Sequence, residues 1–180
     1  MRPHILFPAR GALMATAVLA ATLLAGCNPT YNWRDHASPD GAWKALFPAK
    51  PATFARNVDL DGLQVEMTMT AAEVAGVTFA VGSANAPDGA RAQAALPAMR
   101  RALLRNIGKD DDVTPATPAT PATHDELQVD ATGSSNGRPM RLQGRFVARG
   151  ARVFQVIVLG KPDAAPPEQV EQFLTSFTPQ

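Results

Sequence analysis

The sequence has few of the residues that build covalent or metal-based sites. It contains one cysteine, Cys27, and three histidines in 180 residues. A lone cysteine cannot form a disulfide within the chain, so the fold must be stabilised by apolar burial. His36 and His124, the histidines beyond the amino-terminal segment, have no second histidine or free cysteine at ligand spacing. A zinc site would need mainly carboxylate ligands, which is unusual, so we predict no metal and no cofactor.

Long apolar runs are also scarce, and the longest lies at the amino terminus. Between Gly11 and Gly26 the residues are almost all apolar, and Arg2 and Arg10 precede them without an acidic residue. This order is typical of a secretory signal peptide. The run is shorter than the roughly 20 residues that a membrane-spanning helix needs. We therefore interpret residues 1–26 as a signal peptide.

The apolar run ends in Leu24-Ala25-Gly26-Cys27. This motif resembles the lipobox of bacterial lipoproteins, including uncharacterised proteobacterial ones. The resemblance implies that Cys27 carries a diacylglyceryl group and becomes the first residue of the mature protein, with residues 27–31 as a tether. Two or three acyl chains on one residue would hold the protein firmly on a membrane. The alternative is an ordinary signal peptide followed by an unmodified thiol.

The residue after the cysteine bears on location. Asn28 stands where an aspartate would favour retention in the inner membrane under enteric-type sorting. The lipoprotein resemblance therefore implies the outer membrane, with the domain facing the periplasm.

No large excess of charge of either sign is present. The chain has 17 basic and 16 acidic residues, and removal of residues 1–26 takes away Arg2 and Arg10 only, which leaves 15 against 16. Nucleic-acid-binding domains are usually strongly basic, so we expect no nucleic-acid partner. The 154 residues that remain after the 26-residue segment suit one domain, which we place at 32–180.

Alternating apolar and polar residues predict a series of strands, and two segments have helical spacing. The Asp61-Gly62 dipeptide predicts a tight hairpin, and Asp88 and Gly108 are expected to cap the first helix. The expected strands are 32–36, 42–47, 53–60, 63–72, 77–84, 127–132, 140–149 and 152–159, and the expected helices are 91–107 and 168–176. This order predicts an α+β fold with a largely antiparallel sheet and two helices packed on it.

Three tandem Pro-Ala-Thr units at 115–123 interrupt this pattern. Their low complexity indicates a solvated loop at 110–124 within the domain. The preceding Asp110, Asp111 and Asp112 lack the glycine and terminal acid of an EF-hand loop, so we interpret them as solvated residues and not as a calcium site.

Two short motifs carry a second resemblance. The segment Trp43–Pro51 reads WKALFPAKP, and Phe173-Leu174-Thr175-Ser176-Phe177 stands near the end of the sequence. These segments resemble the opening and closing motifs of small bacterial domains with the PsbP-like fold. The resemblance implies an α/β/α sandwich, and it implies no catalytic residue because that fold serves accessory and binding roles.

The candidate catalytic residues have simpler interpretations. Ser134 and Ser135 lie in a glycine-rich turn, expected at 133–137, without the strand-to-helix elbow of a hydrolase serine. That turn opens no helix, so it is a poor phosphate site. The paired acids Asp59 with Asp61 and Asp125 with Glu126 adjoin turns, and we interpret them as turn residues. We therefore predict no catalytic residue.

Two groups of residues raise the possibility of contact with a membrane or partner. Tyr31, Trp33 and Trp43 suit lipid headgroups, but we expect them to pack on the core with each indole N–H satisfied at its edge. The helix arginines Arg100, Arg101 and Arg105 suit anionic lipid, but we expect a solvated helix face.

A third group is the basic strand with Arg138, Arg141, Arg145 and Arg149. One interpretation is an anion-binding stripe. The other, which we favour, is that opposite charges pair across the preceding strand when both apolar sets face the core. The register expected from a turn at 133–137 pairs Asp130 with Arg141, Gln128 with Gln143, and Glu126 with Arg145.

These features together predict a non-enzymatic envelope lipoprotein that acts as an accessory or binding module for an unidentified envelope protein. Two alternatives are a periplasmic small-molecule carrier and a hydrolase of unrecognised type. A pocket between helix and sheet with converging polar groups would favour the carrier. Clustered carboxylates with perturbed pKa values would favour the enzyme, and a flat exposed apolar patch would favour a protein partner.

Overall fold

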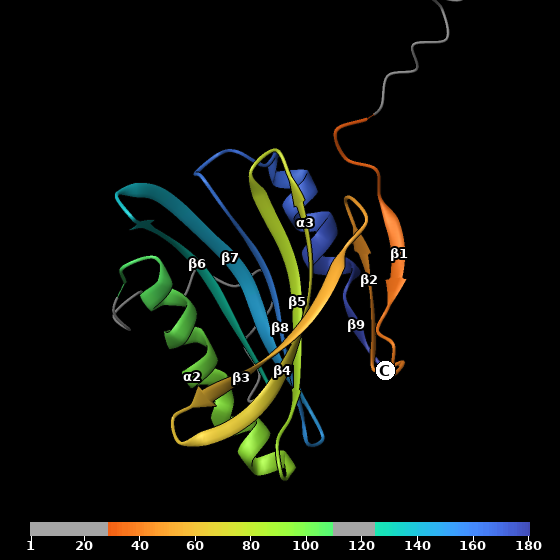
Figure 1. The fold of residues 1–180 in the computed structure, drawn as a ribbon, viewed down its shortest axis with the longest axis vertical. Helices are drawn as coiled ribbons and strands as arrows, with labels where there is room; N and C mark the ends of the chain where they lie inside the picture. The colour runs from red at the N-terminus through yellow and green to blue at the C-terminus, as the bar shows by residue number, and fades with distance from the viewer. Residues whose placement is uncertain (1–28, 110–124) are drawn as a thin grey trace, which may run out of the picture.

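The structure is a computed structural model that describes residues 29–109 and 125–180. The predicted signal peptide, Cys27, Asp110–Asp112, the Pro-Ala-Thr units and His124 lie outside the described residues. The described elements, shown in Figure 1, are β1 (Arg34–Ala37), β2 (Trp43–Phe47), β3 (Ala52–Leu60), β4 (Leu63–Val74), β5 (Val77–Asn85), α2 (Gly89–Asn106), β6 (Glu126–Ser135), β7 (Arg138–Arg149), β8 (Arg152–Gly160), α3 (Pro167–Ser176) and β9 (Thr178–Pro179).

The strands form two antiparallel sheets. The larger has six strands in the order β3-β4-β5-β8-β7-β6, and the smaller has three in the order β1-β2-β9. The predicted α+β class, with a largely antiparallel sheet and two helices, is confirmed. The division into two sheets was not predicted, because alternation in one strand does not identify its partner.

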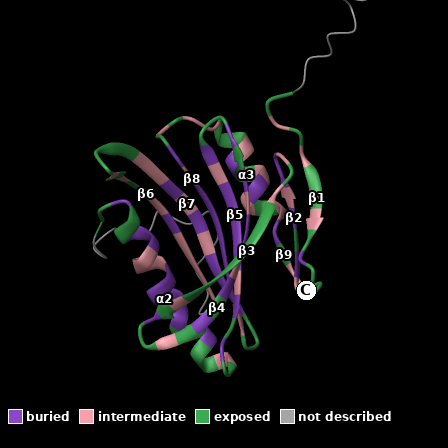
Figure 2. Ribbon diagram, in the orientation of Figure 1, coloured by how far each residue is buried: buried purple, intermediate pink, exposed green. Residues whose placement is uncertain are grey.

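Both faces of the central part of the six-stranded sheet are covered by apolar side chains. On one face lies α2, whose Leu96, Met99 and Leu104 pack with Phe146 and Ile157 of the sheet. The opposite face is covered by α3 and the three-stranded sheet (Figures 1 and 2). The apolar cluster there contains the fully buried residues Phe47, Phe79, Phe154, Val156 and Phe173. The sheet is therefore the middle layer of the fold.

Local signals set the ends of α2 as the sequence predicts. The Asp88 Oδ1 atom accepts a hydrogen bond from the Arg91 N–H at 2.8 Å, which caps the amino end. Gly108 has a positive φ of 64° just beyond the carboxyl end, where its N–H donates to the Arg105 carbonyl at 3.0 Å. Pro97 lies inside the helix, which continues through it.

The predicted β3–β4 hairpin is confirmed at Asp61-Gly62. Both residues have positive φ, 54° and 88°, as a tight hairpin turn requires. The Asp59 side chain accepts hydrogen bonds from the Gly62 N–H at 2.6 Å and from the Gln64 amide at 2.5 Å. Asp61 pairs with Arg101 of α2. The acids Asp59 and Asp61 therefore serve the turn and its contact with the helix.

The predicted β6–β7 register is wrong by two residues. Asp130 lies opposite Gln143, Gln128 lies opposite Arg145, and Glu126 lies opposite Val147. The error follows from the turn, because β6 continues through Ser135 and β7 starts at Arg138, which leaves only Asn136 and Gly137 between them. The predicted alternation of faces is still confirmed, since a shift of two residues returns each side chain to the same face.

Asp40 connects the β1–β2 turn to the larger sheet. Its carboxylate accepts hydrogen bonds from the Ala42 N–H at 3.2 Å and from Arg152 at 2.6 Å. A hydrogen bond from the Ser38 side chain is the main cause that lowers the pKa of Asp40 to about 2, and Ala42 and Arg152 add to it. The ionised carboxylate is therefore the form that stabilises the folded state.

Asp40→Asn is expected to destabilise the protein at neutral pH but not in acid. The pKa of Asp40 is about 2 in the folded state, below its ordinary value of 3.8. The charged carboxylate therefore stabilises the fold at pH values above 3.8, and this stabilisation is lost as the pH falls toward 2. Because the side chain is exposed, we expect at most about 1 kcal/mol. Urea unfolding of both proteins at neutral pH and in steps from pH 4 to pH 2 measures this. A difference that does not shrink on acidification would contradict the prediction.

Candidate functional site

A groove lies between α3 and the outer part of the larger sheet. It arises because the apolar layer on this face stops short of the sheet edge: the cluster contains Val147 of β7 and no residue of β6. The rest of the β6–β7 hairpin therefore presents polar side chains here. Between this polar surface and α3 is a cavity of about 710 Å³. This volume is within the usual range of small-molecule sites, about 300–1,000 Å³.

The two sides of the groove differ in chemistry. The sheet contributes the polar side, from alternate positions of two neighbouring strands. The other side is mainly apolar and comes from α3 and the loop that precedes it. The polar side consists of Glu126, Gln128, Asp130, Arg141, Gln143 and Arg145. The apolar side includes Ala164, Ala165, Pro167, Val170 and Leu174.

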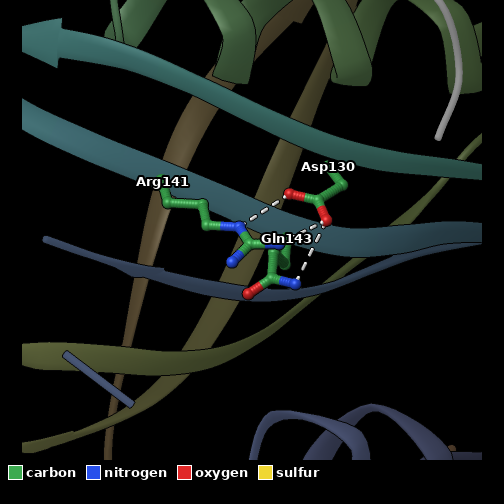
Figure 3. A network of polar contacts seen from close by, with 3 residues as sticks. All are labelled: Asp130, Arg141 and Gln143. Carbon is green, nitrogen blue, oxygen red and sulfur yellow. Dashed lines mark hydrogen bonds and ion pairs between the residues drawn. The ribbon is translucent and has the colours of Figure 1, made fainter. Parts of the chain in front are cut away.

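Arg141 is held at the polar side by Asp130 (Figure 3). Its Nε and Nη2 atoms donate to the two carboxylate oxygens at 2.9 and 2.8 Å, a bidentate arrangement. Gln143 donates to the same carboxylate at 3.3 Å. The bond to Asp130 is the main cause that raises the pKa of Arg141, and the charge of Asp163 adds to it. The register places Arg141 diagonally across from Asp130, and the long arginine side chain reaches the carboxylate from that position.

Arg145 connects the groove to the carboxyl-terminal segment. One Nη atom lies 3.7 Å from a Glu126 oxygen, and the other donates to the Phe177 carbonyl at 2.8 Å. Its guanidinium carbon lies 5.6 Å from the centre of the Phe177 ring. Arg145 Nε is buried without a hydrogen-bond partner among the described residues. Both groove arginines are thus paired with acids, as the charge-pairing interpretation of this strand predicts, even though the register differs.

Two further acids, Asp163 and Glu171, complete the charged lining. Asp163 lies in the loop before α3 and Glu171 lies on the helix itself, and both are exposed. The lining therefore has four acidic residues against two basic ones. Since Arg141 and Arg145 are paired with Asp130 and Glu126, the groove carries a net negative charge.

The predicted aromatic residues pack on the core, as expected. Trp43 is buried, and the Trp33 indole N–H donates to the Gln169 side chain at 3.0 Å. Tyr31 stacks on Trp33 and meets Phe79 edge-on, in both cases with 6.2 Å between ring centres. Burial is the main cause that raises the pKa of Tyr31, and the charge of Glu168 adds to it. Through these contacts the segment that precedes β1 packs against α3 and the larger sheet.

The other candidate residues are dispersed. His36 lies on β1 against Trp43 and Phe47, with ring centres 5.8 and 5.6 Å apart. Its Nε2 atom is buried with no hydrogen-bond partner in the described part of the chain. Ser134 and Ser135 belong to β6, and Asp125 accepts a hydrogen bond from Gln93 at 2.6 Å. Within residues 29–109 and 125–180, no three histidines, cysteines or acids are grouped to hold a metal ion.

Sequence reasoning found the polar side of the groove but missed the groove. The alternation of Glu126, Gln128 and Asp130 with apolar residues predicts this polar face. The position of α3 (Pro167–Ser176) over this face is a tertiary arrangement of segments that are distant in the sequence, and no local pattern reports it.

Among the described helices, none combines the length and the apolar character that a membrane crossing needs. No profile of a known protein family matches the chain, and no curated protein sequence is significantly similar to it.

Proposed function

We propose that this protein is a non-enzymatic lipoprotein of the bacterial envelope whose domain binds a small ligand in the groove between α3 and the β6–β7 hairpin. Lipid on Cys27 would hold the domain at a membrane, with the outer membrane and its periplasmic face as the proposed location. The mass of the mature amino-terminal peptide tests this anchor directly, because an unmodified Cys27 would refute it.

The groove is the observation that supports a binding role. It combines an apolar helix side with convergent polar groups on a rigid sheet, which is the usual composition of a ligand site. The two acids on the sheet side are engaged structurally: Asp130 holds Arg141 at 2.8 Å, and Glu126 lies 3.7 Å from Arg145. Such pairing suits positioning of polar groups better than proton transfer. A small-molecule carrier is therefore the form of binding module that we favour over a protein-docking module.

The mature full-length protein, held in solution by a nonionic amphipathic polymer, should bind small organic molecules at this groove. A screen of mixed compounds, followed by amide chemical shifts, measures it. We expect shifts to concentrate at residues 126–130, 141–145 and 163–175. Leu174→Trp should fill the groove and abolish them, whereas Gln172→Trp, on the same helix outside the groove lining, should not. Shifts confined to another surface, or none at all, would contradict the proposed function.

A further inference from the structure

The charged residues of the groove indicate a particular class of ligand. We propose that the groove binds an organic cation with an apolar body, such as a substituted alkylammonium. This inference rests on the proposed binding function. It adds the sign of the ligand's charge and the residues that select it.

The arginines are poorly placed to select an anion. Asp130 occupies the edge of the Arg141 guanidinium that is formed by Nε and Nη2, with bonds of 2.9 and 2.8 Å. Arg145 donates to the Phe177 carbonyl at 2.8 Å and lies beside Glu126. An anion would have to displace these carboxylates or approach them closely. Either event costs free energy, because like charges repel and broken charged hydrogen bonds must be replaced.

The two exposed acids favour the opposite sign. Asp163 and Glu171 lie on the helix side of the groove, where the remaining lining is largely apolar. Lys161, two residues before Asp163, lines a small neighbouring cavity together with Arg141 and Asp163, but it does not line this one. A cleft lined by an excess of one charge, with apolar walls, concentrates ions of the opposite charge.

The geometry then divides the ligand into two parts. Its apolar body would lie against Ala165, Val170 and Leu174, where burial of apolar surface stabilises the complex. Its cationic group would lie near Glu171 and Asp163, at the open side, where it remains partly hydrated. An ammonium group with apolar substituents suits this position because it needs few directed hydrogen bonds.

Calorimetric titration with three probes of equal chain length tests the proposal: hexyltrimethylammonium, hexanoate and hexanol. The full mature protein is used in the same nonionic polymer, with empty polymer as the blank. We expect the cation to bind about two- to fivefold more tightly than hexanol, hexanoate to bind more weakly than hexanol, and added salt to weaken the cation alone.

Glu171→Gln and Asp163→Asn preserve shape and remove charge, so each should reduce the affinity for the cation about two- to fivefold and leave hexanol unchanged. Glu168→Gln is the matched control, because Glu168 lies on the same helix near Tyr31 and outside the groove lining. Hexanoate binding as tightly as the cation, or Glu171→Gln and Glu168→Gln behaving alike, would overturn the cation proposal. If no probe bound and the compound screen also failed, the proposed function itself would fall.

Ammonium groups occur both on free solutes and on lipid headgroups. A titration with dihexanoylphosphatidylcholine separates the two sources. Binding as tight as that of hexyltrimethylammonium, and equally sensitive to Glu171→Gln, supports a headgroup ligand. Binding weaker than that of hexyltrimethylammonium supports a free cation as the ligand, since the lipid phosphate would be repelled by the acids of the groove. In both cases the preference for the ammonium group itself is the result that supports the proposal.

Discussion

Phe173→Ala is expected to destabilise the domain by about 3–5 kcal/mol, the usual cost of removing a buried aromatic side chain. Phe173 is fully buried on α3, and its ring centre lies 5.4 Å from those of Phe47 and Phe79. Phe47 belongs to the small sheet and Phe79 to the large one, so this ring joins three elements. Truncation would leave a cavity that the surrounding rings can close only partly.

Urea unfolding measures the change, with Leu174→Ala as the matched control. Leu174 is the next residue on the helix, but it is only partly buried and lines the groove, so we expect its loss to cost about 1 kcal/mol. The loss expected for Phe173→Ala is a large fraction of the free energy of unfolding, since whole domains are stable by only about 5–15 kcal/mol. If both variants lost the same small amount, Phe173 would not be the residue that seats α3.

The same residue connects stability to the shape of the groove. Glu171 and Leu174 reach the groove from α3, Val170 borders both the groove and the core, and Phe173 reaches the core alone. A helix of 10 residues is too short to be stable alone and depends on that core contact. The groove wall is therefore positioned by a buried ring that does not itself line the groove.

The strands and helices were predictable wherever one face is buried and the ends carry turn chemistry. Asp61-Gly62 placed the β3–β4 hairpin, and Asp88 placed the start of α2. The β6–β7 register was not, because Gly133-Ser134-Ser135 reads as turn residues although these residues continue the strand. The sequence alone does not show that Gly133 packs closely against another element. In the structure it lies against Ile107, at the end of α2.

The candidate site was predictable only on its sheet side. The alternation of Asp130 with neighbouring apolar residues identified a polar face, and the pairing of Asp130 with Arg141 followed from opposite charges within reach. The helical spacing of Val170, Phe173 and Leu174 indicates an apolar face that packs on the sheet, and all three residues contact the apolar cluster there. Leu174 also borders the groove, because the six-stranded sheet extends beyond the layer that covers it.

Gly133 is the position where this unpredicted contact has its largest consequence. A Cβ atom at Gly133 would lie 2.0 Å from the Ile107 carbonyl oxygen and 3.2 Å from the Ile107 Cβ. The oxygen cannot simply move away, because it accepts a hydrogen bond from the Ser134 N–H at 2.8 Å. Ile107 itself is buried in the core beneath α2. Any added side chain must therefore displace the end of the helix or the strand.

Gly133→Ala is accordingly expected to cost about 3 kcal/mol, the upper part of the range for overpacking a tight contact. Urea unfolding gives the loss, and hydrogen exchange at the Ser134 amide shows whether its bond to Ile107 breaks. Ser134→Ala keeps that amide and removes an exposed hydroxyl, so it should change stability by less than about 0.5 kcal/mol. Gly137→Ala, where a Cβ meets no atom but φ is 73°, isolates the cost of backbone conformation, about 1–2 kcal/mol. If Gly133→Ala were no worse than Gly137→Ala, α2 would not be seated against β6 through this glycine.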